Sequence, residues 1–236
     1  MCRPFSMTTT DYRKTSFYGR RKGKSLRARQ ASLQQSMLPN VRVELSTLRS
    51  EMMASLGFEK ANPVWLEIGF GGGEHLASEA KLHPEICFIG CEPFVNGVAK
   101  LLGLIEQQGI TNIRVHDEEV ADLIANLPDD SIEQVSILYP DPWPKTRHKK
   151  RRLISTEFLA NLARVMKPGS ELRFATDIDD YAGWTLSRIL ESPHFLWNPV
   201  SLSDWEKPWR NWPGTRFEDK AFREGRNPVY LTFCRL

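Results

Sequence analysis

Short apolar runs alternate with amphipathic segments along most of the chain. Apolar residues return at helical spacing between residues 45 and 56, and from residue 64 onward most strand-like apolar runs are followed by a helix-like segment. This alternation favours an α/β domain whose helices connect the strands of a parallel sheet. The predicted strands cover residues 64–68, 86–91, 112–115, 134–139, 171–175 and 229–234. The predicted helices cover residues 45–56, 74–82, 95–107, 120–127, 153–166 and 179–191.

The first 30 residues lack this periodicity and are strongly basic. They hold nine Lys or Arg residues against a single acid, Asp11. Segments with few apolar residues and a high net charge cannot bury enough surface to fold by themselves. We therefore divide the chain into a flexible basic arm over residues 1–40 and a folded domain over residues 41–236.

The overall composition is that of a soluble globular protein. Of the 236 residues, 41% are hydrophobic and 26% are charged, and the four cysteines show neither disulfide-framework nor zinc-site spacing. No apolar run approaches the roughly 20 residues of a membrane span, and the N-terminus lacks the apolar core of a signal peptide. We expect a cytoplasmic protein, a monomer or a homodimer, with no metal and no membrane partner.

A glycine-rich turn follows the strand at residues 64–68. Glycines let the backbone turn tightly and let a ligand approach without a clash with Cβ, and a strand, such a turn and a helix open many nucleotide-binding sheets. A dinucleotide fingerprint would need its third glycine at Glu74. The sequence from Glu67 to Gly73 has instead the spacing E-x-G-x-G-x-G, which resembles that of class I S-adenosylmethionine-dependent methyltransferases.

Acidic residues also follow the next two strands. Glu92 ends the strand at residues 86–91, about 20 residues beyond the glycines, where a carboxylate accepts hydrogen bonds from ribose hydroxyls in nucleotide-binding sheets. Asp117 and Glu119 follow the third strand, where class I methyltransferases commonly contact the adenine amino group. Either acid could do so, with Glu119 the first choice. The other interpretation is that both acids complement the dipole of the following helix.

The fourth predicted strand is followed by the segment Pro140–Pro144, in which Asp141 and Trp143 alternate with three prolines. The prolines stiffen this segment and push the residues before them away from helical geometry. The segment lies at the edge of the sheet where ligands bind in α/β proteins. Six cations lie within residues 145–152, a density that suits phosphate groups. A carboxylate and an indole beside a polycationic run indicate an enzyme that acts on a nucleic-acid base.

Three motifs together resemble one family. They are the glycine turn with Glu67, the Pro-Asp-Pro-Trp segment with its basic run, and the tetrad Thr215-Arg216-Phe217-Glu218. Over residues 40–236 the chain is similar to the bacterial tRNA (guanine-N7)-methyltransferases. The resemblance implies an α/β class I methyltransferase (Rossmann-like) three-layer fold, with a seven-stranded, mostly parallel sheet whose last strand is antiparallel. It also implies S-adenosylmethionine-dependent methyl transfer to N7 of the guanine at position 46, in the variable loop of tRNA.

The resemblance also assigns roles to residues of this sequence. Asp141 would be the catalytic residue and would also contact the cofactor. The other cofactor contacts would be Glu67, Gly69, Gly71, Glu92 and Glu119. The substrate guanosine would be bound by Lys145, Asp177, Thr215, Arg216, Phe217 and Glu218. Contacts to RNA would come from Arg147, His148, Lys149, Lys150, Arg151 and Arg152.

Guanine N7 carries a free lone pair and no proton, so its methylation needs no general base. We therefore expect Asp141 to anchor the guanine by accepting hydrogen bonds from its donor edge, and Trp143 either to stack on the extruded base or to pack. Two other functions are left open. One is methylation of an exocyclic amine, because Asp141-Pro142-Trp143 resembles the Asp-Pro-Pro-Tyr pattern of such enzymes. The other is RNA binding without catalysis on the same fold.

Overall fold

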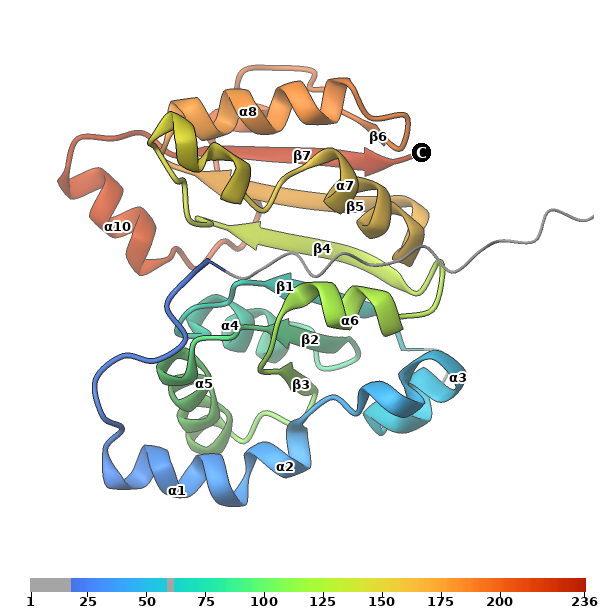
Figure 1. The fold of residues 1–236 in the computed structure, drawn as a ribbon, viewed down its shortest axis with the longest axis vertical. Coiled ribbons are helices and arrows are strands. Elements are labelled where there is room, and N and C mark those ends of the chain that lie inside the picture. The colour runs from blue at the N-terminus through green and yellow to red at the C-terminus, as the bar shows by residue number, and fades with distance from the viewer. Residues whose placement is uncertain (1–17, 59–61) are drawn as a thin grey trace, which may run out of the picture.

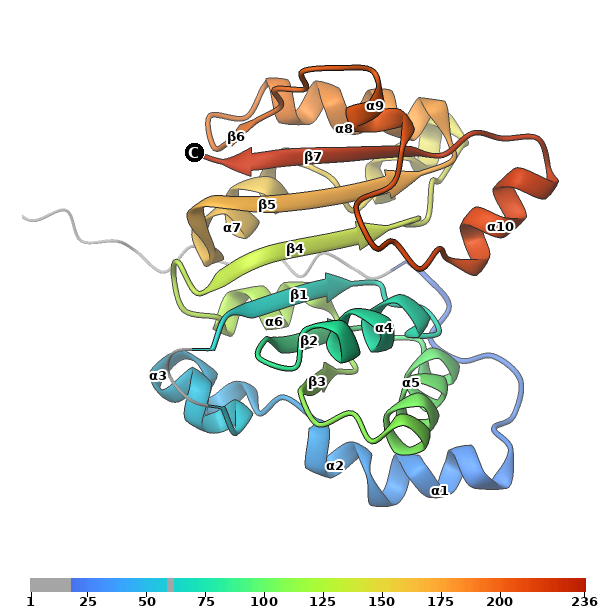
Figure 2. The ribbon, with the colours of Figure 1, turned by 180° about the vertical axis from the view of Figure 1, so that it is seen from behind.

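The computed structural model describes residues 18–58 and 62–236. Residues 1–17, and with them the start of the predicted basic arm, lie outside the described residues. Over the described residues a single sheet is flanked by helices on both faces (Figure 1), and Figure 2 shows the same layers from behind. This is the three-layer α/β arrangement that the sequence predicts.

The strands form one mixed sheet. They are β1 (Val64–Ile68), β2 (Cys87–Cys91), β3 (Ile113–His116), β4 (Ile132–Leu138), β5 (Met166–Thr176), β6 (Phe195–Leu196) and β7 (Val229–Arg235). Within the described residues the sheet has seven strands in the order β3-β2-β1-β4-β5-β7-β6. The first five are parallel, whereas β7 runs antiparallel to β5 and to β6, which confirms the prediction. The strand order reverses between β1 and β4, where open α/β sheets bind ligands.

Two helical layers bury the apolar faces of the sheet. One face carries α3 (Leu45–Leu56), α6 (Val120–Asn126), α7 (Thr156–Val165) and α8 (Asp179–Leu190), whose apolar residues form the larger buried cluster with the strands. The other carries α4 (Glu74–Leu82) and α5 (Val95–Gln108), which form a second buried cluster. The C-terminal part adds α9 (Ser203–Glu206) and α10 (Arg216–Arg223). Helix α10 lies at the carboxyl edge of the parallel strands (Figure 1).

Residues 28–40, which the sequence assigns to the flexible arm, lie instead in a pair of helices that extends to residue 41. Helix α1 (Ala28–Ser36) packs on α5, and α2 (Leu38–Val41) contacts β3 (Figure 1). Leu33 and Leu38 are buried in the cluster that α4 and α5 form. With glutamine and serine between them, these leucines give too weak a helical pattern to be recognised from sequence. The surface of α5 supplies the burial that a short helix lacks by itself.

The helix predicted over residues 153–166 is shorter and starts later. Residues Thr146–Arg151 form a 3-10 helix, η1, and α7 begins only after Ser155. The Ser155 hydroxyl accepts a hydrogen bond from the Phe158 amide at 3.1 Å. A side-chain cap of this kind satisfies one of the free backbone donors at the start of a helix. The cap therefore fixes the boundary at a point that apolar periodicity does not reveal.

The turn after β1 depends on glycine. Gly69, Gly71 and Gly73 have φ angles of 76°, 57° and 79°, in the left-handed region that residues with a Cβ disfavour. The turn also packs closely on α5, because a Cβ at Gly97 would lie 2.1 Å from the Gly71 carbonyl oxygen. Glycine at these positions therefore lets backbone atoms of the turn pack against the backbone of α5 without a side chain between them.

A buried ion pair flanks this turn. Glu67 of β1 and His75 of α4 have side chains that are 6% and 10% exposed, and 2.7 Å separates Glu67 Oε2 from His75 Nδ1. Burial lowers the pKa of His75 and Arg173 acts in the same direction, but Glu67, helped by Glu79, more than compensates, so the pKa lies above its ordinary value. The His75 ring also contacts that of Trp212, with ring centroids 4.8 Å apart. The pair therefore connects β1 and α4 to the C-terminal loop.

This shift predicts a pH-dependent stability. Because folding raises the pKa of His75, the protonated pair stabilises the native state below the unfolded pKa, and the contribution is lost as the pH rises through the folded pKa. We expect His75→Gln to lower the free energy of unfolding by about 2 kcal/mol at pH near 5.5 and by less at pH near 9, as measured by urea denaturation. His194→Gln, at a half-buried histidine elsewhere, is the control. An equal loss at both pH values would contradict the prediction.

Candidate active site at the carboxyl edge of the sheet

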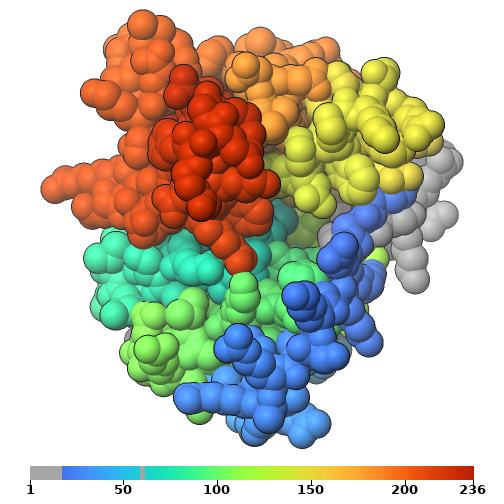
Figure 3. Space-filling model, turned by 90° about the vertical axis from the view of Figure 1, so that its left-hand side faces the viewer, coloured from blue at the N-terminus to red at the C-terminus, as the bar shows by residue number. Residues whose placement is uncertain are grey.

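A pocket of about 900 Å³ opens at the carboxyl edge of the sheet. Its walls come from the turns after β1, β2 and β4, from α6, η1, α10 and the start of α7, and from residues 18–20. Figure 3 shows this face, with α10 in red, the residues around position 150 in yellow, and the N-terminal segment in blue. A concave site of this size, at the point where the strand order reverses, is where a ligand is expected in such a sheet.

Glu92, directly after β2, forms the floor of the pocket with the glycine turn. Its carboxylate accepts hydrogen bonds from the Gly71 amide at 2.8 Å and from the Phe94 amide at 3.0 Å. Burial raises the pKa of Glu92, although both amides favour its charged form. The Gly69 amide donates to the Cys91 carbonyl oxygen at 2.8 Å, which joins the turn to β2. Gly69, Gly71 and Glu92 all line the pocket.

The two acids that follow β3 are placed differently. Glu119 lines the pocket, where it forms an ion pair with Arg21 of the N-terminal segment. Asp117 is not among the lining residues, and its carboxylate lies 2.6 Å from the Arg42 guanidinium. His116 fixes the intervening turn, because its Nε2 lies 3.1 Å from the Glu119 carbonyl oxygen. Of the two candidates for the adenine contact, Glu119 is the one at the pocket.

Asp141 lies at the pocket on a turn of unusual geometry. Tyr139 and Trp143, on either side of it, have φ angles of 51° and 42°. Non-glycine residues rarely occupy this left-handed region, and such strain is often found at functional sites. Asp141 is exposed to solvent within the pocket, yet the pocket walls remove part of its water and raise its pKa above the ordinary value. The carboxylate that the sequence singles out thus shares a cavity with the glycine turn.

The basic run that follows is divided between the surface and the interior. Arg147 and Lys150 are exposed on η1. Arg151 lies over the rings of Tyr18 and Trp143, with its guanidinium carbon 4.8 Å and 5.0 Å from the ring centroids. Lys150 and Arg151 both line the pocket. The run therefore places part of its positive charge on one rim of the cavity.

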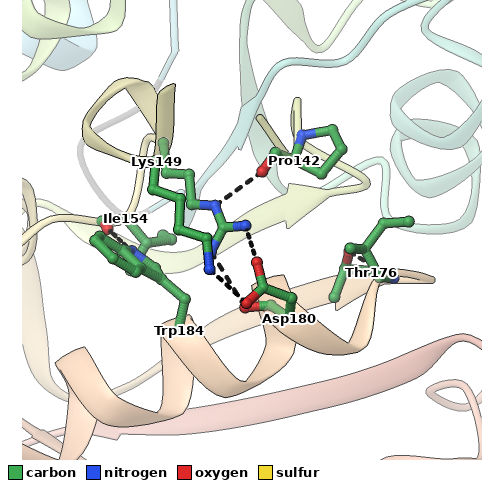
Figure 4. A network of polar contacts seen from close by, with 8 residues as sticks. Pro142, Lys149, Ile154, Thr176, Asp180 and Trp184 are labelled. Atoms are coloured by element: carbon green, nitrogen blue, oxygen red, sulfur yellow. Dashed lines mark hydrogen bonds and ion pairs between the residues drawn. The ribbon is translucent and has the colours of Figure 1, made fainter. Parts of the chain in front are cut away.

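Arg152 is the exception among the residues expected to contact RNA. Its side chain is 0% exposed and forms an ion pair with the Asp180 carboxylate. It donates to the carbonyl oxygens of Pro142 at 2.8 Å and Asp180 at 3.1 Å, and its guanidinium lies over the Tyr181 ring. Figure 4 shows the contacts that converge on Asp180, including that of Lys149. Although Arg152 is among the residues around the pocket, these partners enclose its guanidinium, so that it supports the segment after β4. Its predicted contact to RNA stays a prediction.

The tetrad that begins at Thr215 combines a helix cap with pocket residues. The Thr215 hydroxyl accepts a hydrogen bond from the Glu218 amide at 3.1 Å, and the Glu218 carboxylate accepts one from the Thr215 amide at 3.2 Å. Glu218 is 5% exposed and also accepts hydrogen bonds from the Trp212 indole at 2.7 Å and from the Tyr230 hydroxyl. The two residues between Thr215 and Glu218 line the pocket. The structure thus uses the outer residues of the tetrad to position the inner ones.

Three further residues predicted to contact the cofactor or the guanosine do not line the pocket, and neither do Arg147, His148 and Lys149 of the basic run. Glu67 is engaged by His75 beside the glycine turn. Asp177, directly after β5, forms an ion pair of 2.7 Å with Arg226. Lys145 is exposed immediately before η1. Their roles toward cofactor and guanosine stay predictions.

Several residues that line the pocket are not predicted from the sequence. Lys220 and Arg223 lie four and seven residues after Arg216, a spacing that becomes a signal only once residues 216–223 are known to be helical. An apolar part of the wall comes from residues next to the predicted acids, and burial alone does not distinguish them from core. These wall residues are Ile68, Phe94, Val120 and Ile124.

Within residues 18–58 and 62–236, His, Cys, Asp and Glu side chains do not gather into a group that could hold a metal ion. Over the same part of the chain, no helix has both the length and the apolar character needed to cross a membrane. Cys87 and Cys91 are free and buried, and burial raises the pKa of Cys87 to about 12. This thiol therefore stays protonated in the core.

The fold is shared with known methyltransferases. A solved structure described as an antibiotic-related methyltransferase matches with a TM-score of 0.55 at 15% identity, over 83% of this chain and 96% of that chain. The precorrin-6y C5,15-methyltransferase of Geobacter metallireducens matches with a TM-score of 0.51 at 15% identity, over 91% of this chain and 94% of that chain. Similarity at this level of identity concerns the fold alone, and it confirms the predicted class I methyltransferase fold.

Comparison of the sequence with known proteins identifies the family of this chain. Residues 61–231 match a family described as "Putative methyltransferase". The tRNA (guanine-N(7)-)-methyltransferase of Agrobacterium fabrum is 47% identical over 220 residues, which is 93% of this chain and 95% of the relative. The protein of the same name from Rhodopseudomonas palustris is 45% identical over 230 residues, which is 98% of this chain and 90% of the relative. The resemblance seen in the three motifs is confirmed, and this chain belongs to the tRNA (guanine-N7)-methyltransferase family.

Proposed function

We propose that this protein transfers a methyl group from S-adenosylmethionine to N7 of the guanine at position 46, in the variable loop of tRNA. The proposal rests on one observation: a single pocket is lined by the glycine turn, by Glu92 and Asp141, and by a rim of cations. The names of the relatives from Agrobacterium fabrum and Rhodopseudomonas palustris support the tRNA substrate and the guanine N7 target. Because tRNA is a cytoplasmic substrate, we place the proposed activity in the cytoplasm. We expect the protein to act as a monomer or a homodimer.

The residues of the pocket fit S-adenosylmethionine. Glu92 keeps acceptor capacity beyond its two backbone amides, which suits a pair of ribose hydroxyls. Val120 and Ile124 offer an apolar surface for an adenine ring, and Glu119 an acceptor for its amino group. When bound, this cofactor supplies a methyl group on a positively charged sulfur. The acidic floor suits that positive charge.

Asp141 is placed to orient the base. In the proposal its carboxylate accepts hydrogen bonds from N1–H and the 2-amino group of an extruded guanine. Those donors lie on the edge opposite N7, so holding them aims N7 at the cofactor side of the pocket. Because N7 has a lone pair and loses no proton, orientation is what this residue contributes. Asp141 therefore acts without accepting a proton from N7.

Product analysis tests the proposed function. Incubation of the protein with labelled S-adenosylmethionine and an unmodified tRNA transcript is expected to give 7-methylguanosine as the labelled nucleoside. A transcript with adenosine in place of guanosine at position 46 is expected to remain unlabelled. Label on an exocyclic amine would indicate the first alternative activity, and binding of tRNA with no label in any nucleoside would indicate the second.

Asp141→Asn tests the anchoring role. The asparagine keeps the size of the side chain but points an amide donor at the donor edge of guanine. We expect single-turnover methyl transfer to fall by about 100-fold, the usual effect of misplacing a reacting group. Asp130→Asn, in the turn before β4 at the other end of the strand, is the matched control. Near-normal rates for Asp141→Asn would rule out the anchor.

The raised pKa of Asp141 predicts that activity falls on the acid side of the pH–rate profile. We call this fall the acid limb. Its carboxylate is protonated at a higher pH than the ordinary value of 3.8, and the proposal requires the charged acceptor. We expect kcat/KM for tRNA to fall as the pH drops through an apparent pKa above 3.8, because the acceptor is neutralised there. The residual activity of Asp141→Asn should lack this limb, and an unchanged limb in the variant would assign it to another group.

A further inference from the structure

We propose that α10 forms a second RNA-binding surface, so that the tRNA backbone is held between α10 and η1. We call Arg216, Lys220 and Arg223 the α10 basic surface. The proposal rests on the proposed function, because it names further contacts to the same polynucleotide. It adds a surface to the pocket rim that the basic run at residues 145–152 does not supply.

The three cations share one face of the helix. Lys220 lies four residues after Arg216 and Arg223 three residues further on, and such spacings bring side chains to the same side of an α-helix. All three line the pocket, whereas Asp219 and Glu224 of the same segment are not among the lining residues. In Figure 3, α10 stands out in red beside the hollow, across from the yellow residues around position 150. The cations therefore face the cavity from the rim opposite to η1.

The opposite face of α10 is fixed to the protein. Glu218 and Ala221 are buried, at 5% and 0% exposure. The Glu218 carboxylate is held by the Trp212 indole, the Thr215 amide and the Tyr230 hydroxyl. Because these contacts anchor the helix at its first turn, the α10 basic surface is held in place before RNA arrives, which reduces the entropy lost on binding.

The cations of this surface are accessible. The side chain of Arg216 is 44% exposed and lies 4.0 Å from Glu74, and that of Lys220 is 60% exposed and lies 3.8 Å from Glu224. Exposed pairs of this kind are weak, so phosphate groups can replace the carboxylates. This contrasts with Arg152, whose side chain is 0% exposed.

Aromatic residues on α10 add a second feature of nucleic-acid surfaces. Phe217 and Phe222 are 47% and 57% exposed, and Phe217 lines the pocket next to Arg216. Exposed aromatic rings among cations are the combination on which unstacked bases and their phosphates bind. An extruded nucleotide in the pocket carries phosphates on both sides of its ribose. Lys150 and Arg151 on η1 and the α10 basic surface can hold them from the two sides.

The salt dependence of tRNA binding tests the proposal. The double variant Lys220→Gln with Arg223→Gln removes two charges and keeps good helix-forming residues. Each lost phosphate contact lowers the slope of log affinity against log salt by about 0.7 to 0.9 units, so we expect a decrease of about 1.5 units. Affinity for tRNA at low salt should fall by about 10-fold or more. The matched control is Arg49→Gln with Lys81→Gln, two exposed cations outside the pocket lining.

Two further measurements make the result decisive. Calorimetric affinity for S-adenosylmethionine should be unchanged in both double variants, which shows that the fold and the floor of the pocket are intact. The charge-preserving exchange Lys220→Arg with Arg223→Lys should restore most of the wild-type slope. Wild-type slope and affinity in the Lys220→Gln, Arg223→Gln variant would overturn the α10 proposal alone. Failure of the wild-type protein to form 7-methylguanosine would instead overturn the proposed function.

Discussion

The close approach of the turn after β1 to β2 and α5 determines the geometry of the site. The Gly71 amide donates a hydrogen bond to Glu92 at 2.8 Å, and the Gly71 carbonyl oxygen leaves no room for a Cβ at Gly97. Turn, strand and helix are therefore joined largely through backbone atoms, which have little freedom to move apart. A floor built in this way keeps its acceptors in position before any ligand binds, so that binding need not reorganise it.

A second constraint acts at the opposite rim. The buried Glu218 carboxylate accepts hydrogen bonds from the indole of Trp212, the amide of Thr215 and the hydroxyl of Tyr230. A buried carboxylate is tolerated when donors satisfy it in this manner. Removal of one donor would destabilise the fold, because the carboxylate would lose a hydrogen bond without regaining water. This carboxylate thereby fixes α10 against β7. One buried acid thus determines where the cations on the outer face of the helix lie.

Floor and rim carry opposite charge, and each suits a different part of the proposed reaction. Acids lie along the floor and near the β4 turn, where a sulfonium cofactor and the donor edge of guanine would bind, and cations lie on the rims, where phosphates would bind. The buried Arg152 supports this division, because it holds the segment that carries Asp141 through the Pro142 carbonyl oxygen at 2.8 Å. The floor and turn acids are Glu92, Glu119 and Asp141, and α7 adds Glu157 to the wall; the rim cations include Arg20, Lys150, Arg151, Arg216, Lys220 and Arg223.

The sequence alone determined the alternation of strands and helices between residues 64 and 191, the glycine turn, and the group formed by Glu92 and Asp141, because carboxyl ends of parallel strands meet at one edge of a sheet. It did not determine which members of each motif face the pocket. Arg152 turns inward because its partner Asp180 lies in a distant part of the chain. Glu218 caps α10 locally through Thr215, but its carboxylate is buried because Tyr230 of β7 also donates to it. Apolar periodicity and motif spacing describe neighbours along the chain. The direction of a charged side chain is decided by contacts that only the tertiary structure brings together.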